Sequence, residues 1–331
     1  MLSASLAVYG QSAVDASQFF LDQAPLSVTL STDIGNLVSG KIKDNNQKAI
    51  FTCKLPDSST VSEEILINAR GHMRRSICYM PPLKLNFRNA SSPKLYPLNS
   101  LKLVCACRGG DDYQQLLLKE YLVYKMYNLL TEKSFRVRLL NITYEDTKEK
   151  KNPGIQYAFF VENIDALAKR NRCKEWKGVK LHTETTDREL MTMLAIFEYM
   201  IGNTDWSVPG DHNVKLIVSK KDSTTRPFAI PYDFDYSGIV NAEYAVPEPQ
   251  LGIENVTQRL YRGYPRNMEE LNAVLAVYNL QKENIYAVIN ECEPLSNQYK
   301  KQMIHYLDDF YKTINDPVMV KHTFINDARQ Q

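Results

Sequence analysis

Short runs in which apolar and polar residues alternate occupy the chain between residues 48 and 106. These runs read KAIFTCKL, EEILINA, PLKLNF and SLKLVCAC, and the segments between them are rich in Asp, Ser, Asn, Pro and Gly. Alternation bounded by turn-forming residues is typical of half-buried β-strands. We therefore expect an antiparallel meander in this part of the chain.

The periodicity changes after the GGDD turn at residues 109–112. The segment YQQLLLKEYLVYKMYNLL has apolar residues near helical spacing beside a wider apolar surface, which predicts one long, buried helix. Two more strand-like runs follow, SFRVRLLNITY and IQYAFFVENI, joined by the charged loop EDTKEKKNPG. Sheet, helix and hairpin together predict an N-terminal lobe over residues 41–165.

The remaining half of the chain has mainly helical patterns. Thr186 and Glu189 have capping-box spacing before LMTMLAIFEYMI, a core helix that should end at Gly202. A hairpin built from VKLIV and RPFAIPYDF follows, and helical patterns with Pro and Gly breaks continue to about residue 313. We predict an α+β, two-lobed architecture with a mainly helical C-terminal lobe at residues 166–331 and a hinge at residues 162–165.

Composition narrows the class of protein. The 331 residues are 44% hydrophobic and 24% charged, with a formal net charge of +2, which is typical of a globular domain and does not favour a nucleic-acid partner. No run of about 18 apolar residues occurs, so we expect no transmembrane segment. Cys105 and Cys107 are one residue apart, which places them on one face of a strand as buried thiols and not around zinc.

The first 40 residues form a separate N-terminal segment in this interpretation. No Lys or Arg precedes Lys41, and LSASLAVYGQ is similar to the end of a secretion signal. We therefore expect an extracytoplasmic or secreted protein. A frayed N-terminus on a cytoplasmic protein is the alternative.

Carboxylates and an amide gather around two loops of the second half. Asp205 and Asn213 lie in GNTDWSVPGDHNVKLIV, between the core helix and the hairpin, while Asp233 and Asp235 alternate with aromatic residues in IPYDFDYSG. Two carboxylates on one side of an extended segment repel each other unless a cation lies between them. Magnesium suits such oxygen ligands, so Asn213, Asp233 and Asp235 are candidate ligands for Mg²⁺ or Mn²⁺.

The order of these motifs is the one that protein kinases use. In that plan an Asp orients or deprotonates the acceptor hydroxyl, an Asn holds a metal, and a later Asp joins the metal to ATP. Asp205, Asn213 and Asp233 take these roles in sequence. Seven residues separate Asp205 from Asn213 where kinases have four, so the loop contains an insertion.

The first half offers candidates for nucleotide binding. Lys102 lies on the strand before the long helix and Glu120 lies in that helix, so we expect an ion pair between them; Lys84 is the rival lysine. The segment NARGHMRRS would cover phosphates through Arg70, Gly71 and Arg74, or else form a basic surface turn. The hinge FVENID, which contains Glu162 and Asn163, would offer backbone groups to adenine.

These segments together resemble the CotH family, the kinases named for spore coat protein H, between about residues 69 and 262. The likeness rests on RGHMRRS, KLVCAC, KEYLVYKMYNLL followed by SFRVRL, FFVEN, GNTDW with HN, and PYDFDYSG. It implies a protein-kinase-like fold and metal-dependent phosphorylation of protein Ser or Thr by ATP, with Asp205 catalytic and Asp233 binding the metal. The segment YMPPLKLNF departs from the adjacent lysines that the family often has after its Arg-Gly loop.

Two other functions remain open at this point. A pseudokinase-like scaffold would keep the binding site without turnover. A metal-dependent phosphoester hydrolase would use Asp233 and Asp235 as paired ligands and release phosphate without an acceptor. The sequence does not specify the hydroxyl acceptor, for which a protein is our expectation.

Overall fold

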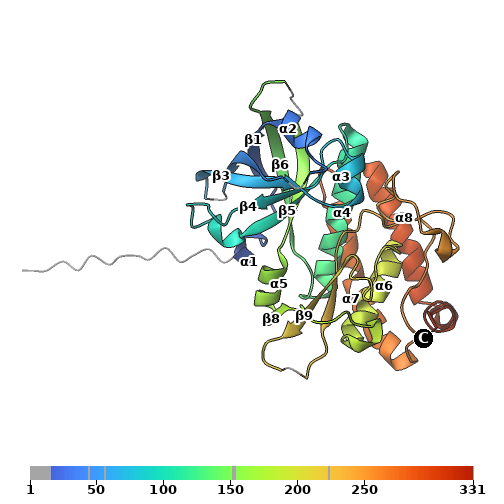
Figure 1. The fold of residues 1–331 in the computed structure, drawn as a ribbon. Coiled ribbons are helices and arrows are strands. Elements are labelled where there is room, and N and C mark those ends of the chain that lie inside the picture. Colours follow the sequence, from blue (N-terminus) through green and yellow to red (C-terminus); the bar gives the residue numbers. More distant parts are fainter. Residues whose placement is uncertain (1–15, 44, 56, 151–153, 223, 331) are drawn as a thin grey trace, which may run out of the picture.

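The computed structural model describes residues 16–330 other than 44, 56, 151–153 and 223. The segment LSASLAVYGQ, expected to end a secretion signal, lies outside the described residues. The described chain forms a β-barrel that packs beside a group of helices, with the long helix α4 between the two (Figure 1).

Seven strands close into a mixed barrel in the order β1-β2-β3-β4-β5-β7-β6. β1 pairs in parallel with β6 and antiparallel with β2, and the other neighbours are antiparallel. Their bounds are β1 Leu26–Thr32, β2 Gln47–Lys54, β3 Thr60–Ala69, β4 Leu83–Asn86, β5 Ser100–Cys105, β6 Val137–Asp146 and β7 Ile155–Val161.

The closed barrel overturns the expected two-lobed, protein-kinase-like fold with an open antiparallel sheet. The cause is β1, which lies in the segment assigned to residues 1–40 and closes the sheet by pairing Leu26 with Leu140. Alternating positions on the strands fill the barrel interior with a core of its own, which includes Leu30, Phe51 and Phe160. The barrel begins with β1 at Leu26, before residue 41, where the N-terminal lobe was expected to start.

The helical part has a second hydrophobic core, and the predicted long, buried helix is confirmed as α4 (Asp111–Leu130), which packs against α7, β6 and β7. The predicted core helix is confirmed as α6 (Arg188–Ile201), and Gly202 ends it in the left-handed conformation at φ 68°. Its N-cap is Asp187 and not Thr186, because the Asp187 side chain accepts the Leu190 N–H.

The other elements complete this part. A small sheet has the order β10-β9-β8, and no helix among the described residues combines the length and apolar character needed to cross a membrane. The bounds are β8 Cys173–Glu175, β9 Val214–Ser219, β10 Phe228–Pro231, α1 Ala16–Phe19, α2 Ile34–Ser39, α3 Met73–Ile77, α5 Ile164–Arg170, α7 Met268–Asn290, α8 Asn297–Ile314 and α9 Pro317–Lys321; short turns of helix occur at Tyr96–Leu98, Thr183–Thr185, Pro249–Leu251 and His322–Asn326.

A disulfide joins Cys78, just after α3, to Cys107, just after β5. The expectation that Cys105 and Cys107 are both buried thiols is wrong for Cys107, whereas Cys105 is a free, buried thiol. The two joined segments also share a hydrogen bond from the Tyr79 N–H to the Cys107 carbonyl at 2.8 Å. The disulfide therefore fixes α3 against the strand that precedes α4.

Candidate functional site

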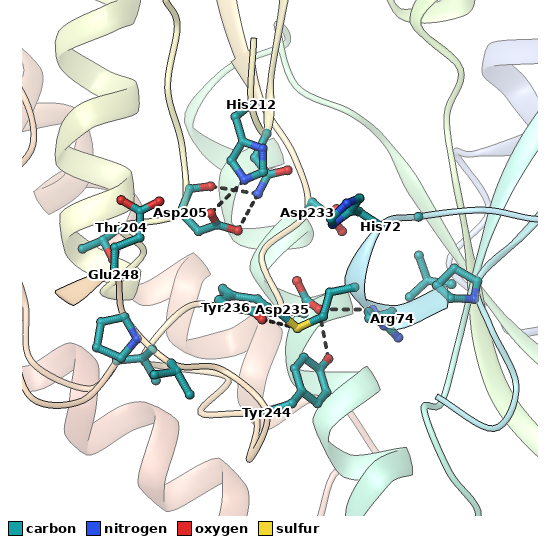
Figure 2. Close-up of a pocket in the computed structure, with 18 of the residues that line it drawn as sticks. His72, Arg74, Thr204, Asp205, His212, Asp233, Asp235, Tyr236, Tyr244 and Glu248 are labelled. Carbon is teal, nitrogen blue, oxygen red and sulfur yellow. Dashed lines mark hydrogen bonds and ion pairs between the residues drawn. The ribbon is translucent and has the colours of Figure 1, made fainter. Parts of the chain in front are cut away.

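A pocket of about 370 Å³ lies where the segment between β3 and β4 faces the loops that follow α6 and β10. Arg70, Gly71, His72 and Arg74 line it from the barrel, and Thr204, Asp205, His212, Asn213, Asp233 and Asp235 line it from the helical part. Figure 2 shows Asp205 and His212 on one side of the pocket, Arg74 on the other, and the two aspartates of PYDFDYSG between them.

Asp205 and Asn213 are brought together by a tight turn. Ser207 and His212 exchange backbone hydrogen bonds of 2.9 and 3.0 Å, so the inserted residues loop out while the two functional residues meet. The Asn213 side-chain amide donates to Asp205 Oδ2 at 2.9 Å and to the Asp205 carbonyl at 2.8 Å. His212 Nε2 lies 2.8 Å from Asp205 Oδ1, so both carboxylate oxygens are oriented.

Asn213 presents an oxygen toward possible ligands. Its amide nitrogen is used by Asp205, and its amide oxygen has no hydrogen-bond partner among the residues that the structure describes. Asn213 and Asp233 also have left-handed φ angles of 51° and 67°. Such angles cost free energy in residues with a side chain, and they cluster at functional sites.

Asp233 and Asp235 have different surroundings. The Asp235 carboxylate is buried, accepts a hydrogen bond from the Tyr244 hydroxyl at 2.9 Å and lies 3.7 Å from the Arg74 guanidinium. Burial and the neighbouring Asp233 charge raise the pKa of Asp235 to about 6. The Asp233 carboxylate, by contrast, makes no hydrogen bond or ion pair with any other described side chain or backbone group. Asp233 is thus the more available metal ligand.

Arg74 is the buried cation of the barrel side. Its guanidinium contacts Glu120 Oε2 at 3.0 Å and donates to the Cys105 carbonyl at 2.6 Å. Burial raises the pKa of Glu120, and the Arg74 charge opposes that rise. Because the two groups are in direct contact, we treat them as an ion pair that holds Arg74 at the pocket wall.

The expected ion pair between Lys102 and Glu120 is therefore wrong, because Arg74 occupies that partner position. Lys102 Nζ lies 4.3 Å from the centroid of the Tyr232 ring, and burial lowers the pKa of Lys102 to about 7. Lys84 pairs with Lys102 in the β4–β5 register and is exposed. Neither lysine lines the pocket. The order of residues along the chain could not show that Arg74 on α3, and not Lys102, would contact Glu120.

Glu162 and Asn163, expected at the nucleotide, do not line the pocket and have structural contacts. Glu162 is buried, pairs with Arg170 at 3.0 Å and accepts the Arg136 N–H at 3.1 Å. Asn163 caps α5 by accepting the Ala166 N–H at 2.8 Å. Arg70 and Gly71, in contrast, do line the pocket.

Sequence reasoning missed several residues that line the pocket, among them His212, His72 and Tyr244. His212 stands beside Asn213 in the quoted HN motif, so its position next to a candidate ligand was an available signal. His72 lies inside the RGHMRRS segment and was equally open to inspection. Tyr244 had no local signal, since its contact with Asp235 depends on how the chain turns after PYDFDYSG.

The donor set suits a magnesium-like ion with few protein ligands. No group of three or more His, Cys, Asp or Glu side chains within the described part of the chain is arranged to hold a metal. Mg²⁺ usually takes only one or two carboxylates and completes its shell with waters and phosphates. One open carboxylate at Asp233 and one amide oxygen at Asn213 fit that requirement.

Comparison with known families and curated proteins does not assign this chain to a family. No protein-family model matches the chain, and no curated protein matches it at a significant level.

Proposed function

We propose that this protein is an atypical kinase that transfers the γ-phosphoryl group of ATP to a hydroxyl acceptor, with Mg²⁺ or Mn²⁺. One observation carries the proposal: Asp205 and Asn213 from one loop and Asp233 from another meet in one pocket that Arg70 and Arg74 line from the opposite side. The resemblance of these segments to the CotH family points to the same chemistry, with protein Ser or Thr as the acceptor.

Asp205 acts on the acceptor in this proposal. The acceptor oxygen forms a bond to the γ-phosphorus, the bond from that phosphorus to the bridging oxygen breaks, and ADP leaves. The acceptor proton passes to the Asp205 carboxylate, which Asn213 and His212 hold in a fixed orientation.

Asp233 and the amide oxygen of Asn213 are the residues that would hold the metal, whose charge would offset that of the phosphates. Arg70 and Arg74 add positive charge from the barrel side, and Gly71 at φ 89° lets the backbone approach a ligand closely. The two sides of the pocket thus complement a metal-bound triphosphate.

The alternative of a hydrolase with paired aspartate ligands has weaker support. Tyr244 and Arg74 contact the Asp235 carboxylate, which leaves that group less free to bind a metal together with Asp233. A scaffold without turnover would use the same pocket, so an activity measurement separates it from a kinase.

An extracytoplasmic location is part of the proposal. The Cys78–Cys107 disulfide supports it, because disulfides persist mainly in oxidising compartments. Peptide mapping of protein taken from its native cells, without reduction, should recover the two cysteines in one cross-linked fragment. Recovery of both as free thiols would favour the cytoplasmic alternative.

Calorimetric titration of ATP with and without Mg²⁺ tests the ligand. Binding should be strong only when the metal is present, because the aspartates repel a bare triphosphate. Equal affinity with metal and with a chelator, or no binding in either condition, would contradict the proposal.

A further inference from the structure

A carboxyl group lies buried among the mainly apolar residues of the core helix α6. Glu198 of α6 is 1% exposed and does not line the pocket. Its Oε2 accepts a hydrogen bond of 2.9 Å from the side-chain amide of Asn203, which is equally buried. The contact joins the core helix to the loop that carries Asp205.

Asn203 continues the link to the pocket. Its side-chain oxygen accepts the backbone N–H of Asp205 at 3.0 Å, and its own N–H donates to the Glu198 carbonyl at 2.7 Å. Both ends of the Asn203 amide are therefore used, one by Glu198 and one by Asp205. The Asn203 amide therefore links the Glu198 carboxyl to the Asp205 backbone.

Burying the Glu198 carboxyl costs free energy of hydration, which indicates that the group has a role. Burial raises the pKa of Glu198 to about 8, so the group is mainly uncharged at neutral pH. Its Oε1 is buried without a hydrogen-bond partner, as is the hydroxyl of Tyr127 on α4. An apolar side chain in this place would avoid that loss of hydration.

We propose that Glu198 is a positioning residue that fixes the Asp205 backbone through Asn203 and so aims the Asp205 carboxylate into the pocket. The consequence for catalysis rests on the proposed kinase activity, whereas the consequence for the geometry of the loop does not. Glu198 touches neither ATP nor the acceptor, so it acts on turnover and not on nucleotide affinity.

Two substitutions of Glu198 and one of Asn203 separate the effect of the hydrogen bond from that of filling space. Glu198→Leu removes the acceptor and should lower kcat by about 10- to 100-fold with KM for ATP within about 2-fold, because a displaced catalytic group costs rate. Glu198→Gln keeps an acceptor for Asn203 and should retain most of kcat. Asn203→Leu breaks the next contact and should reproduce the loss seen in Glu198→Leu.

Tyr127→Phe is the matched control, because it removes a buried hydroxyl that senses the Glu198 charge but makes no hydrogen bond to Glu198, Asn203 or Asp205. It should leave kcat unchanged. Wild-type kcat in Glu198→Leu would overturn the proposal, as would a loss in Glu198→Gln as large as in Glu198→Leu.

Amide hydrogen exchange over residues 203–213 tests the positioning even if the wild type shows no transfer. Exchange in this loop should be faster in Glu198→Leu and Asn203→Leu than in the wild type, Glu198→Gln or Tyr127→Phe. Unchanged exchange in both leucine variants would overturn the proposal. Faster exchange together with an inactive wild type would contradict the kinase proposal and leave the positioning role supported.

Discussion

Asp233 and Asp235 show how two identical residues, two positions apart in the sequence, acquire different properties from their contacts. Tyr244 and Arg74 engage the Asp235 carboxylate, while the Asp233 carboxylate faces the pocket without a hydrogen-bond partner among the described residues. The alternation of the sequence predicted both side chains on one side of an extended segment, and both line the pocket. It could not show that the hydroxyl of Tyr244, nine residues later, donates a hydrogen bond to Asp235.

Asp233→Asn should weaken ATP binding in the presence of Mg²⁺ by at least about 10-fold, because a neutral amide holds a hard cation less well than a carboxylate. Calorimetry with and without the metal measures the change. Asp235→Asn is the matched control and should have the smaller effect on affinity. Equal losses of ATP affinity in the two variants would indicate that Asp235 is also a metal ligand.

Arg74→Met should destabilise the fold by about 3 to 5 kcal/mol, because it leaves Glu120 buried without its partner. The double variant Arg74→Met with Glu120→Met should recover most of that stability and yet bind ATP weakly. Denaturant unfolding and ATP titration of both variants measure these effects. Lys102→Met should bind ATP normally. A greater loss of ATP affinity in Lys102→Met than in the double variant would contradict the role of Arg74.

Among the elements, α3 has the most consequence for the site although it spans only Met73–Ile77. It carries Arg74 to Glu120 of α4, and the disulfide that follows it fixes its end to the strand before α4. A helix this short has little stability of its own. Its position therefore depends on these contacts with α4 and β5.

Replacing Cys78 and Cys107 together by Ser should lower the free energy of unfolding by about 3 to 4 kcal/mol, from the entropy of closing a loop of 29 residues. The affinity for ATP with Mg²⁺ should fall as well, because Arg74 loses part of its support. Cys53→Ser changes a buried thiol in the barrel and controls for loss of a cysteine. Unchanged ATP affinity in the double variant would show that α3 keeps its place without the disulfide.

At the scale of the whole molecule, the sequence predicted individual helices better than it predicted the closure of the strands into a barrel. The helices α4 and α6 follow from local apolar periodicity, which depends only on neighbouring residues. The barrel depends on the pairing of β1 with β6, whose strands are more than a hundred residues apart, and local alternation does not specify a partner. Likewise, the loop motifs predicted the residues of the helical side of the pocket, while the contact of Arg74 with Glu120 needed the three-dimensional fold.

Stability should also depend on pH through Glu198. Its pKa in the folded protein, about 8, is above its ordinary value of 4.5, so folding favours the neutral form. Below pH 4.5 the neutral Glu198 contributes its full stabilisation to the folded protein. This stabilisation is lost as the pH rises from 4.5 toward 8, by up to about 1.4 kcal/mol per pH unit. Unfolding free energies of wild type and Glu198→Gln should therefore diverge between pH 5 and pH 8, with the wild type losing more. Parallel curves would show that Glu198 does not titrate in this range.

The most direct test of the central claim is transfer of the terminal phosphate from ATP labelled at the γ-position, with Mg²⁺ or Mn²⁺, to protein. We expect covalent label on the protein itself or on added protein substrates for the wild type, and none for Asp205→Ala, although that variant still binds ATP. The expected loss is at least about 10²-fold in rate, the usual worth of a positioned acid or base. Release of the label only as free phosphate would indicate a hydrolase. No turnover by a wild type that binds ATP would indicate a scaffold. Full transfer by Asp205→Ala would contradict the catalytic role of Asp205.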